Sequence, residues 1–374
     1  MSLFQRSIKM KLLSRIIFAV SIVTVVFLWA GALSAYIHPQ TLRYAGVVGL
    51  GFPYLLVAAL AALLLCVCFR PRRSWIPAVG ILLCIGSIRT YFPINFPSIA
   101  PKDCMKVMTF NVRGWGGGKC YTEDKAHNLV AKYMAESKAD IICVQEANAA
   151  KSFYDKFVRR EVTHTPYMDS IKLTGNMLTL LSAYPIVRKQ LICRHGVNAS
   201  AAFWLLLDPG DTLLVVNNHL ASNQMSSEER DDWKGMMKAT VSNTIPNDDE
   251  ARAQHASEGK MLITKIADAS IARALMADTI AAFLERNAHL SQLVCGDFND
   301  SPISYSHRLL SRNLTDAYVA TANGVGRTFN EGNIRVRIDN ILCSSDWRPF
   351  QCTIDDACLL SDHYPMTCYL KRKR

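Results

Sequence analysis

Apolar residues are distributed differently in the first ninety residues and in the rest of the chain. The stretches 16–36 and 45–69 contain no charged residue, and each supplies the ~20 residues that cross a bilayer core. A third apolar stretch, 75–88, reaches that length only if it continues past Arg89, whose side chain would extend to the interface. The alternative for this stretch is an interfacial or re-entrant segment. The pattern predicts a membrane segment over residues 1–92 with two to three transmembrane helices.

Basic side chains flank these stretches unevenly. They precede the first (Lys9, Lys11, Arg15) and separate the second from the third (Arg70, Arg72, Arg73), while only Arg43 lies between the first and second. Since Lys and Arg mark the cytoplasmic side, we expect a cytoplasmic N-terminus and, with three spans, an extracytoplasmic globular part. A cleaved signal peptide ending near Ser34 would leave this topology unchanged, whereas loss of the third span would reverse it. The pattern thus predicts an integral protein of the cytoplasmic membrane.

After a proline-containing linker at 93–103, short apolar runs alternate with helical patterns over residues 104–371. Strands are predicted at 106–112, 140–146, 177–183, 201–208, 211–220, 292–298, 336–344, 357–362 and 365–371, and helices at 124–137 and 226–288, the latter opening with a capping box of Ser226 and Glu229. Most runs are too apolar for half-exposed strands. We therefore expect an α/β domain of two β-sheets packed face to face and flanked by helices.

Charge and cysteine content narrow the function little. Residues 1–100 hold nine of the 42 basic residues and no acidic one, which leaves 33 basic against 31 acidic residues in the remainder of this +11 chain. Non-specific nucleic-acid binding needs many Lys and Arg contacts to phosphate, so the globular part shows no strong sign of it. Nine of the twelve cysteines lie in the globular part without a CxxC pair; disulfides 104–120 or 352–368 stay open.

Polar residues end many of the predicted strands, although the apolar strand bodies do not predict them. They are Asn111, Glu146, His219, Asp297 with Asn299, Asp339, and Asp362 with His363. Each alone is more typical of a turn or a solvated loop. Strand ends at one edge of a scaffold are where loops converge and where sites are usually built. Their recurrence predicts one shared site.

These residue types suit a particular chemistry. Asp297 and Asn299 are two apart, so on extended backbone both point to one side while Phe298 faces the core. Carboxylate and amide oxygens such as those of Glu146 and Asn111 are ligands for a hard cation such as Mg²⁺. His219 and His363 can move protons near neutral pH, and Asp339 or Asp362 could hold one imidazole in a single tautomer. Together they indicate metal-assisted hydrolysis of a phosphate ester.

Six segments occur in the order seen in a known superfamily: MTFNVRGW, DIICVQEA, VVNNHL, VCGDFND, VRIDNILCS and LLSDHYPM. They resemble the motifs of the endonuclease/exonuclease/phosphatase superfamily, which includes pancreatic deoxyribonuclease, exonuclease III, bacterial sphingomyelinases and inositol-polyphosphate 5-phosphatases. The resemblance covers about residues 104–371. It implies a four-layered α/β sandwich with its site at one edge of the two sheets.

The resemblance implies a role for each matching residue. Glu146 would be the principal ligand of Mg²⁺ (with Mn²⁺ as an alternative), Asn111 would lie beside it, and Asp362 would lie close to the metal and its waters. Exonuclease III-like members often carry a second acidic residue two positions after the first asparagine. This chain has Arg113 there instead, which puts a second metal position in doubt.

The remaining matches imply catalytic roles. Asp297 would position or deprotonate the attacking water, and Asn299 would contact the scissile phosphate. His363, oriented by Asp339, would stabilise the pentavalent phosphate, and His219 would protonate the leaving group.

The connection from 222 to about 288 is long for a compact domain, and such connections tend to be lids or binding elements. Arg273 within it could bind a substrate phosphate; the alternative is a salt-bridged surface arginine. Three functions follow from these expectations. The first is a membrane-tethered, Mg²⁺-dependent phosphoesterase acting on a phospholipid headgroup, sphingolipid or small phosphorylated molecule. The second is an extracytoplasmic nuclease, and the third is a non-catalytic membrane interaction module. The sequence leaves the oligomeric state open.

Overall fold

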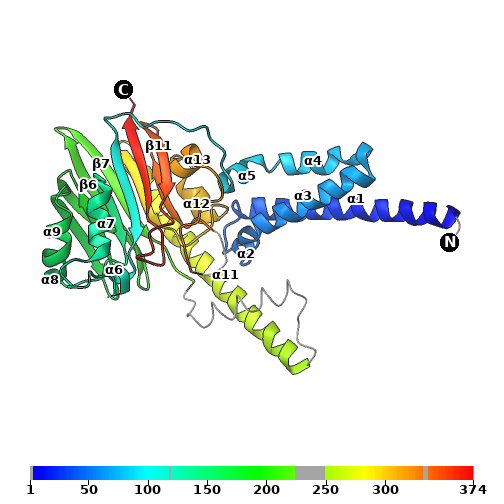
Figure 1. Ribbon diagram of the computed structural model, residues 1–374, viewed down its shortest axis with the longest axis horizontal. Helices are drawn as coiled ribbons and strands as arrows, with labels where there is room; N and C mark the ends of the chain where they lie inside the picture. Colours follow the sequence, from blue (N-terminus) through cyan, green and yellow to red (C-terminus); the bar gives the residue numbers. More distant parts are fainter. Residues whose placement is uncertain (1–2, 118, 224–248, 332–335, 374) are drawn as a thin grey trace.

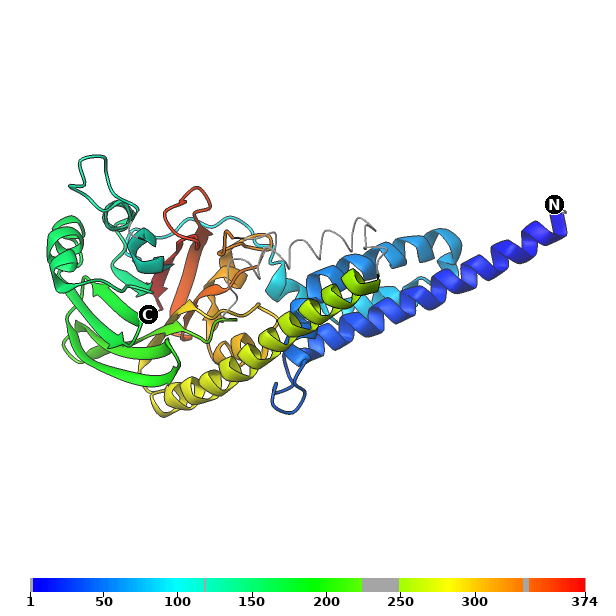
Figure 2. The ribbon, with the colours of Figure 1, turned by 90° about the horizontal axis from the view of Figure 1, so that it is seen from below.

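The computed structural model describes residues 3–117, 119–223, 249–331 and 336–373. Two β-sheets form one end of the molecule, and the apolar helices extend away from it at the other end, as two perpendicular views show (Figures 1 and 2). The predicted capping box at Ser226 and Glu229 lies outside the described residues.

Each sheet has six strands. The first contains, in spatial order, β11 (Trp347–Ile354), β12 (Met366–Arg372), β1 (Met105–Asn111), β2 (Ile141–Gln145), β4 (Asn176–Ser182) and β3 (Tyr167–Leu173). The second contains β5 (Ile186–His195), β6 (Asn198–Asp208), β7 (Asp211–His219), β8 (Ser291–Asp297), β10 (Asp339–Cys343) and β9 (Thr315–Asp316). β1 and β2 are parallel, as are β7 and β8.

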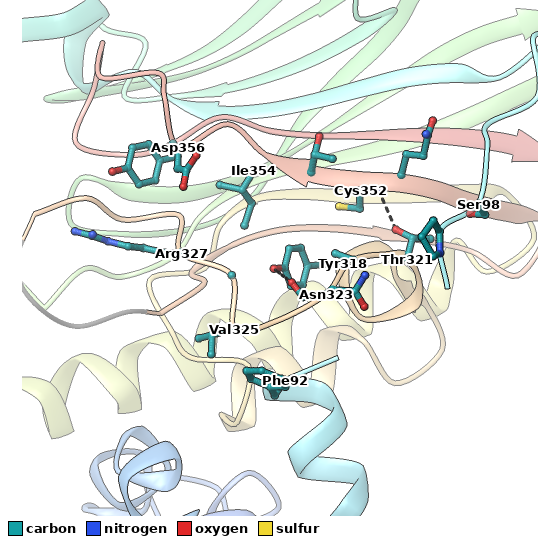
Figure 3. A pocket seen from close by; sticks show the side chains of 16 residues that line it. Phe92, Ser98, Tyr318, Thr321, Asn323, Val325, Arg327, Cys352, Ile354 and Asp356 are labelled. Atoms are coloured by element: carbon teal, nitrogen blue, oxygen red, sulfur yellow. Dashed lines mark hydrogen bonds between the residues drawn. The ribbon is translucent and has the colours of Figure 1, made fainter. Parts of the chain in front are cut away.

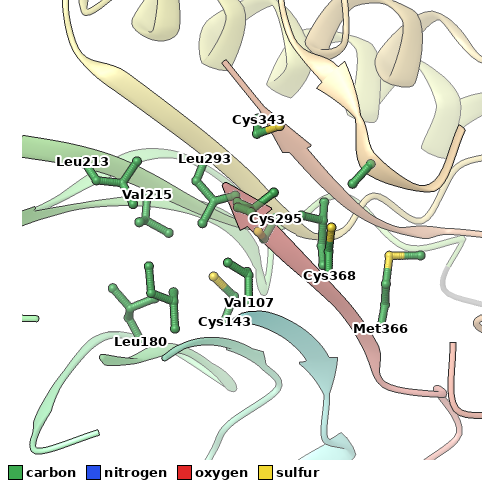
Figure 4. Close-up of a cluster of buried hydrophobic side chains, with 14 of the residues drawn as sticks. Val107, Cys143, Leu180, Leu213, Val215, Leu293, Cys295, Cys343, Met366 and Cys368 are labelled. Atoms are coloured by element: carbon green, nitrogen blue, oxygen red, sulfur yellow. The ribbon is translucent and has the colours of Figure 1, made fainter. Parts of the chain in front are cut away.

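Alternate side chains of the central strands fill two different layers, as the pleat of a strand requires. On β1, Val107 belongs to the core between the sheets, whereas Met108 and Phe110 pack outward under α7 (Leu129–Ser137). Cysteine, leucine and valine side chains from both sheets meet in the inter-sheet core (Figure 4). α11 (Asp249–Arg286) and α12 (Tyr305–Leu310) cover the outer face of the second sheet. The predicted four-layered α/β sandwich is confirmed.

Short helices complete the domain. These are α8 (Lys151–Phe153), η2 (Tyr154–Val158), α9 (Arg159–Glu161) and α13 (Ala317–Thr321), while α6 (Arg113–Gly117) is a left-handed turn whose residues all have positive φ. The predicted helix over 124–137 begins only at Leu129, where the Asn128 side chain caps it by accepting from the Ala131 N–H.

Eight of the nine predicted strands are present within a few residues of their expected bounds, and one is wrong. Residues 357–362 form a loop in which Cys358 packs against the outer core and Leu359 is 74% exposed. The four strands that the pattern did not predict, β3, β5, β9 and β11, are the four edge strands of the two sheets.

Five helices make up the predicted membrane segment: α1 (Leu3–Ser34), α2 (Ala45–Leu50), α3 (Phe52–Phe69), α4 (Trp75–Leu82) and α5 (Ile85–Tyr91), with the short turn η1 (Pro71–Arg73) between α3 and α4. Among the described residues, two helices, Lys9–Ser34 and Phe52–Phe69, are long and apolar enough to cross a membrane. The predicted second span is interrupted at Gly51, where α2 ends and α3 begins. A third crossing exists only if Pro71–Leu82 and Ile85–Tyr91, bent by 58°, count as one span.

Candidate active site

The register of the second sheet aligns three of the predicted residues. His219 on β7 pairs with Asp297 on β8, and Asp297 pairs with Asp339 on β10. Partners in register place their side chains on the same face of a sheet. All three are almost completely buried. The row therefore brings one imidazole and two carboxyl groups to one edge of the sandwich.

The first sheet supplies the opposite wall. Asn111, the last residue of β1, is 1% exposed, and its Nδ2 donates to Asp297 Oδ2 at 3.1 Å and to Glu146 Oε1 at 3.2 Å. Glu146 directly follows β2 and has a left-handed backbone with φ 52°. These two hydrogen bonds join the edges of both sheets at one place.

The His363 imidazole lies between the carboxyl groups of Asp339 and Asp297. Its Nδ1 lies 2.8 Å from Asp339 Oδ2, and its Nε2 lies 3.6 Å from Asp297 Oδ2. Burial by itself lowers the pKa of His363, but the Asp339 and Asp297 carboxylates outweigh it and raise this pKa to about 10. At neutral pH His363 is therefore an imidazolium between the Asp339 and Asp297 carboxyl groups.

His219 has the opposite protonation state. Its Nδ1 accepts a hydrogen bond of 2.8 Å from Asn176 Nδ2. The amide orientation of Asn176 follows from its other bonds, because Nδ2 also donates to the Val197 carbonyl and Oδ1 accepts from the Met177 N–H. Burial lowers the pKa of His219. The ring is thus neutral with its proton on Nε2, which lies 3.7 Å from Glu146 Oε1 and 3.8 Å from Asp297 Oδ2.

Asp297 is at the centre of the site. Burial raises its pKa to about 6, although His363 opposes this rise. Its Oδ1 accepts from the Asn299 N–H at 2.8 Å, and Asn299 Nδ2 lies 3.3 Å from its Oδ2. Phe298 between them is fully buried. The two polar side chains lie on one side and the ring lies in the core, as predicted, but Asn299 has a left-handed backbone with φ 51° where the prediction assumed an extended one.

Glycine is required immediately before Asp297. Gly296 has φ 127°, and a Cβ there would come within 2.1 Å of the Asn218 carbonyl oxygen. Only glycine combines this backbone with so close an approach of β7. The GDFN sequence therefore reflects strand packing as well as chemistry.

Asp362 lies on the open side of the site. Ser361 Oγ contacts both the Asn111 carbonyl oxygen (2.8 Å) and Asp362 Oδ1 (3.2 Å), which places Asp362 beside Asn111. Arg113 Nη1 lies 3.5 Å from Asp362 Oδ2 and 2.6 Å from Glu331 Oε1. A guanidinium thus lies next to these two acidic side chains.

Arg273 is the one predicted site residue that lies apart from the others. It is 3% exposed on α11, its Nε pairs with Asp300 Oδ2 at 3.1 Å, and its Nη1 donates to the Ala221 carbonyl at 3.0 Å. These contacts hold the loop after β7 to the loop after β8. Arg273 is therefore salt-bridged, as one of its two alternatives expects, but it is buried and does not lie at the surface; binding of a substrate phosphate by Arg273 stays a prediction.

Asn176 is a site residue that the sequence analysis missed. The predicted site residues lie at strand ends, but β4 is antiparallel to β2, so it is the start of β4 that reaches the site edge. A polar residue opening an apolar strand after Gly175 was the available signal.

The acidic edge fits a hard divalent cation. Ligand atoms of Asp297, Asp339 and His363 lie within 4.8 Å of one another, but the protonated His363 has no free lone pair, so in this state only the two carboxyl groups can bind a cation. Among the described side chains, Asp339 Oδ1 is a buried acceptor without a hydrogen-bond partner, and buried acceptors are normally satisfied. Glu146, whose side chain is 38% exposed, provides a further carboxylate. Oxygen donors of this kind suit Mg²⁺ better than softer metals.

A hollow of about 840 Å³ lies elsewhere, between the segment after α5 and strand β11 (Figure 3). Phe92, Tyr318, Arg327 and Ile354 line it, together with Tyr364, the neighbour of His363. It contains none of the predicted catalytic side chains.

Comparison with known families agrees with this geometry. Residues 108–363, more than half of the chain, match the model of the endonuclease/exonuclease/phosphatase family. The chain belongs to this family. Members of the family are hydrolases that act on phosphoester bonds, and the chain is an enzyme of this class. Residues 14–91 match a second family model, described as a domain of unknown function.

Solved structures similar to the chain include family members from Bacteroides thetaiotaomicron (15% identity, TM-score 0.48, 75% of this chain and 100% of that one) and Bacteroides vulgatus (18%, 0.47, 73% and 100%). The human Nocturnin catalytic domain with bound sulfate is similar at 13% identity and a TM-score of 0.47, over 74% of this chain and 97% of that one. Comparison with curated proteins finds no match.

Proposed function

We propose that the chain is a membrane-tethered phosphoesterase that hydrolyses a phosphodiester or phosphomonoester by in-line attack of water. The observation that carries this proposal is the junction of both sheets at Asp297, where Asn111, His219, Asn299 and His363 all meet one carboxyl group. Membership of a phosphoester hydrolase family supports it.

Glu146, Asn111 and Asp362 would hold Mg²⁺, or alternatively Mn²⁺, at the open side of this junction. Bound there, the cation supplies charge to polarise a phosphoryl oxygen. Asp339 would act through His363, whose orientation it maintains.

Asp297 is the base in this proposal. A carboxyl group with a pKa near 6 is largely ionised at neutral pH and is still basic enough to accept a proton from water. The Asn111 side-chain amide donates to its Oδ2 and the Asn299 backbone N–H donates to its Oδ1, and these bonds hold the carboxyl group in place. The Asn299 side chain is also close enough to the carboxyl group to contact the scissile phosphate beside it.

The two histidines divide the remaining work. His363 is cationic, so it can stabilise the negative charge that develops on the phosphate and can provide a proton to the leaving oxygen. His219 is a neutral hydrogen-bond donor through Nε2. A histidine that protonates the leaving group is expected to be cationic, whereas His219 is neutral. We therefore assign His219 to binding a phosphate oxygen.

The apolar helices would tether the domain to the cytoplasmic membrane, on its extracytoplasmic side. With the bilayer as a partner and a globular part close to neutral, we expect a phospholipid headgroup, a sphingolipid or another small phosphate ester as the substrate.

The test uses the full chain in detergent or nanodiscs, supplied with Mg²⁺ and offered sphingomyelin, phospholipids, inositol phosphates, a bis-nitrophenyl ester and plasmid DNA. Asp297→Asn and His363→Ala should each lower turnover by about 10²-fold or more while thermal unfolding stays cooperative. Wild-type protein inactive on every ester, or either variant retaining full turnover, would refute the mechanism. Turnover of plasmid DNA alone would replace the lipid substrate with a nucleic acid.

A further inference from the structure

The loop that follows β8, residues 298–304, packs against the apolar helices. Asn299 lies in the site, and four residues later Ile303 is 3% exposed within a different cluster. That cluster also contains apolar side chains of α1 and α3, among them Leu28, Ala32 and Phe52. One short loop therefore has one end among the catalytic groups and the other inside the helical bundle.

Two glycines of α2 allow this contact. A Cβ at Gly49 would lie 2.6 Å from the Ile303 carbonyl oxygen and 2.5 Å from Ser34 Oγ. A Cβ at Gly46 would lie 2.2 Å from Ser270 Oγ on α11. Real Cβ contacts are not this short, so α2 packs against the loop and against α11 as closely as backbone permits.

Polar contacts surround this packed centre. Arg43 pairs with Asp268 at 2.7 Å, and His38 Nε2 lies 3.1 Å from Asp278 Oδ2. Tyr305 donates to the same Asp278 at 2.7 Å. The Arg308 guanidinium lies 3.7 Å from the centre of the Tyr36 ring. Residues 36–50 thus contact α11 and α12, and both ribbon views show α2 beside α11 (Figures 1 and 2).

The contact continues from α11 to the catalytic groups. Arg273 on α11 holds Asp300 and the Ala221 carbonyl. Asn299 Nδ2 donates to the Leu220 carbonyl at 2.9 Å, and the Leu220 N–H donates to the Asp297 carbonyl at 2.9 Å. The loops after β7 and β8 therefore form one unit with α11, and α2 packs against two sides of that unit.

The segment that joins the helices to β1 is also fixed. Asn95 Nδ2 donates to the carbonyls of Val319 and Ala322, and the Gly324 N–H donates to the Pro93 carbonyl. A simple tether would need neither these bonds nor the glycine packing of α2.

We propose that residues 36–50, the surface formed by the α1–α2 connection and α2, are a positioning element of the active site. They hold the loop 298–304 and thereby Asn299 and Asp297, in addition to tethering the domain. This gives a positioning role to part of the segment that matches the domain of unknown function, and it rests on the proposed phosphoesterase function.

The decisive variant is Gly49→Ala, with Gly86→Ala as its matched control. Both replace a helical glycine of the apolar segment, but a Cβ at Gly86 meets nothing within 4 Å. In the full chain, Gly49→Ala should lower kcat by up to about 10²-fold, because small misplacements of reacting groups are costly, with KM changed much less. Gly86→Ala should match wild type.

A second pair of variants tests the contact between α2 and the loop 298–304 by changing the loop. Ile303→Ala should reproduce the loss of kcat even if Gly49→Ala fails to fold, whereas Ile99→Ala, at a side chain that is 89% exposed, should not. Hydrogen–deuterium exchange gives a readout independent of activity. Exchange of the 298–304 peptide should accelerate in both test variants, with protection of the central strands unchanged.

The outcomes separate the two proposals. An inactive wild type refutes the phosphoesterase function, and exchange then still reports on the docking. An active wild type whose Gly49→Ala and Ile303→Ala forms keep full kcat, with or without faster exchange, refutes the positioning role. Loss of protection throughout the domain would also refute it, since that result indicates global destabilisation.

Discussion

The two histidines of the site show how a neighbouring side chain sets the chemistry of the same residue type. His363 faces carboxylates on both nitrogens and is cationic, whereas His219 accepts from an amide and is buried and neutral. An amide nitrogen can only donate, so Asn176 leaves Nδ1 of His219 without a proton. A single residue at the start of β4 thereby makes His219 a donor through Nε2 alone.

This assignment predicts how activity depends on the leaving group. A general acid matters most for esters whose leaving group is a strong base, such as alkyl esters, and little for nitrophenyl esters. We expect His219→Ala to lower kcat/KM by a similar factor on both kinds of ester, since a neutral donor to a phosphate oxygen acts on each. Steady-state kinetics on a matched ester pair measures this.

His363→Ala is the comparison, and it should lower kcat/KM by a larger factor on the alkyl ester than on the nitrophenyl ester. If His219→Ala instead harms the alkyl ester far more than the nitrophenyl ester, His219 is the acid and the tautomer argument fails.

At the scale of elements, sheet edges explain what the apolar pattern missed. Strands β3, β5, β9 and β11 lie at the four edges, and β3 and β5 are largely half-buried or exposed along their length. β11 contains Pro349, which edge strands tolerate. A half-exposed edge strand lacks the continuous apolar run that marks a central strand. The central strands have such an apolar run because they are more deeply buried, and they were therefore predicted.

Helix α11 illustrates a different limit. Its buried Arg273 lies on a face that packs against the loops after β7 and β8, and the amphipathic pattern could not distinguish this face from a surface position. The pairing with Asp300 is buried on both sides, with side chains 3% and 9% exposed. Breaking such a pair by removing one partner costs about 3–5 kcal/mol.

Arg273→Met should therefore lower the midpoint of thermal unfolding by roughly 10 °C, with lost turnover following the lost fold. Arg286→Met, at an exposed arginine of the same helix, is the matched control and should change the midpoint little. Thermal unfolding and KM on one ester measure both effects. A raised KM with an unchanged midpoint would instead show that Arg273 binds the substrate phosphate.

At the scale of the whole molecule, the apolar helices and the sandwich pack together, with the proposed catalytic groups near their junction. The uneven distribution of Lys and Arg predicts which side of the membrane holds the sandwich, and this depends on whether the bent pair α4–α5 crosses. The 58° bend makes that pair the critical element for topology.

Three crossings predict that alkaline phosphatase fused after residue 374 is active in a bacterial host, because this reporter folds only outside the cytoplasm. A fusion after Arg72 should be inactive, since that residue lies on the predicted cytoplasmic side. An inactive C-terminal fusion that is expressed at the control level would mean that α4–α5 does not cross and that the sandwich is cytoplasmic.

The sequence by itself determined the central strands, the apolar helices and the set of polar residues at strand ends. These properties are local, because the period of apolar positions and the type of residue that ends a strand are legible from neighbours along the chain. The order of the motifs also sufficed to identify the family.

Only the tertiary structure decided which of these residues touch. Register places His219, Asp297 and Asp339 in one row, and the packing of two sheets adds Asn111 and Glu146 from far away in the chain. Protonation states, the buried position of Arg273 and the docking of α2 on the catalytic loop depend on partners that no local pattern contains. Contacts between distant segments arise from the shared burial of surfaces, so their chemistry becomes visible only when those surfaces meet.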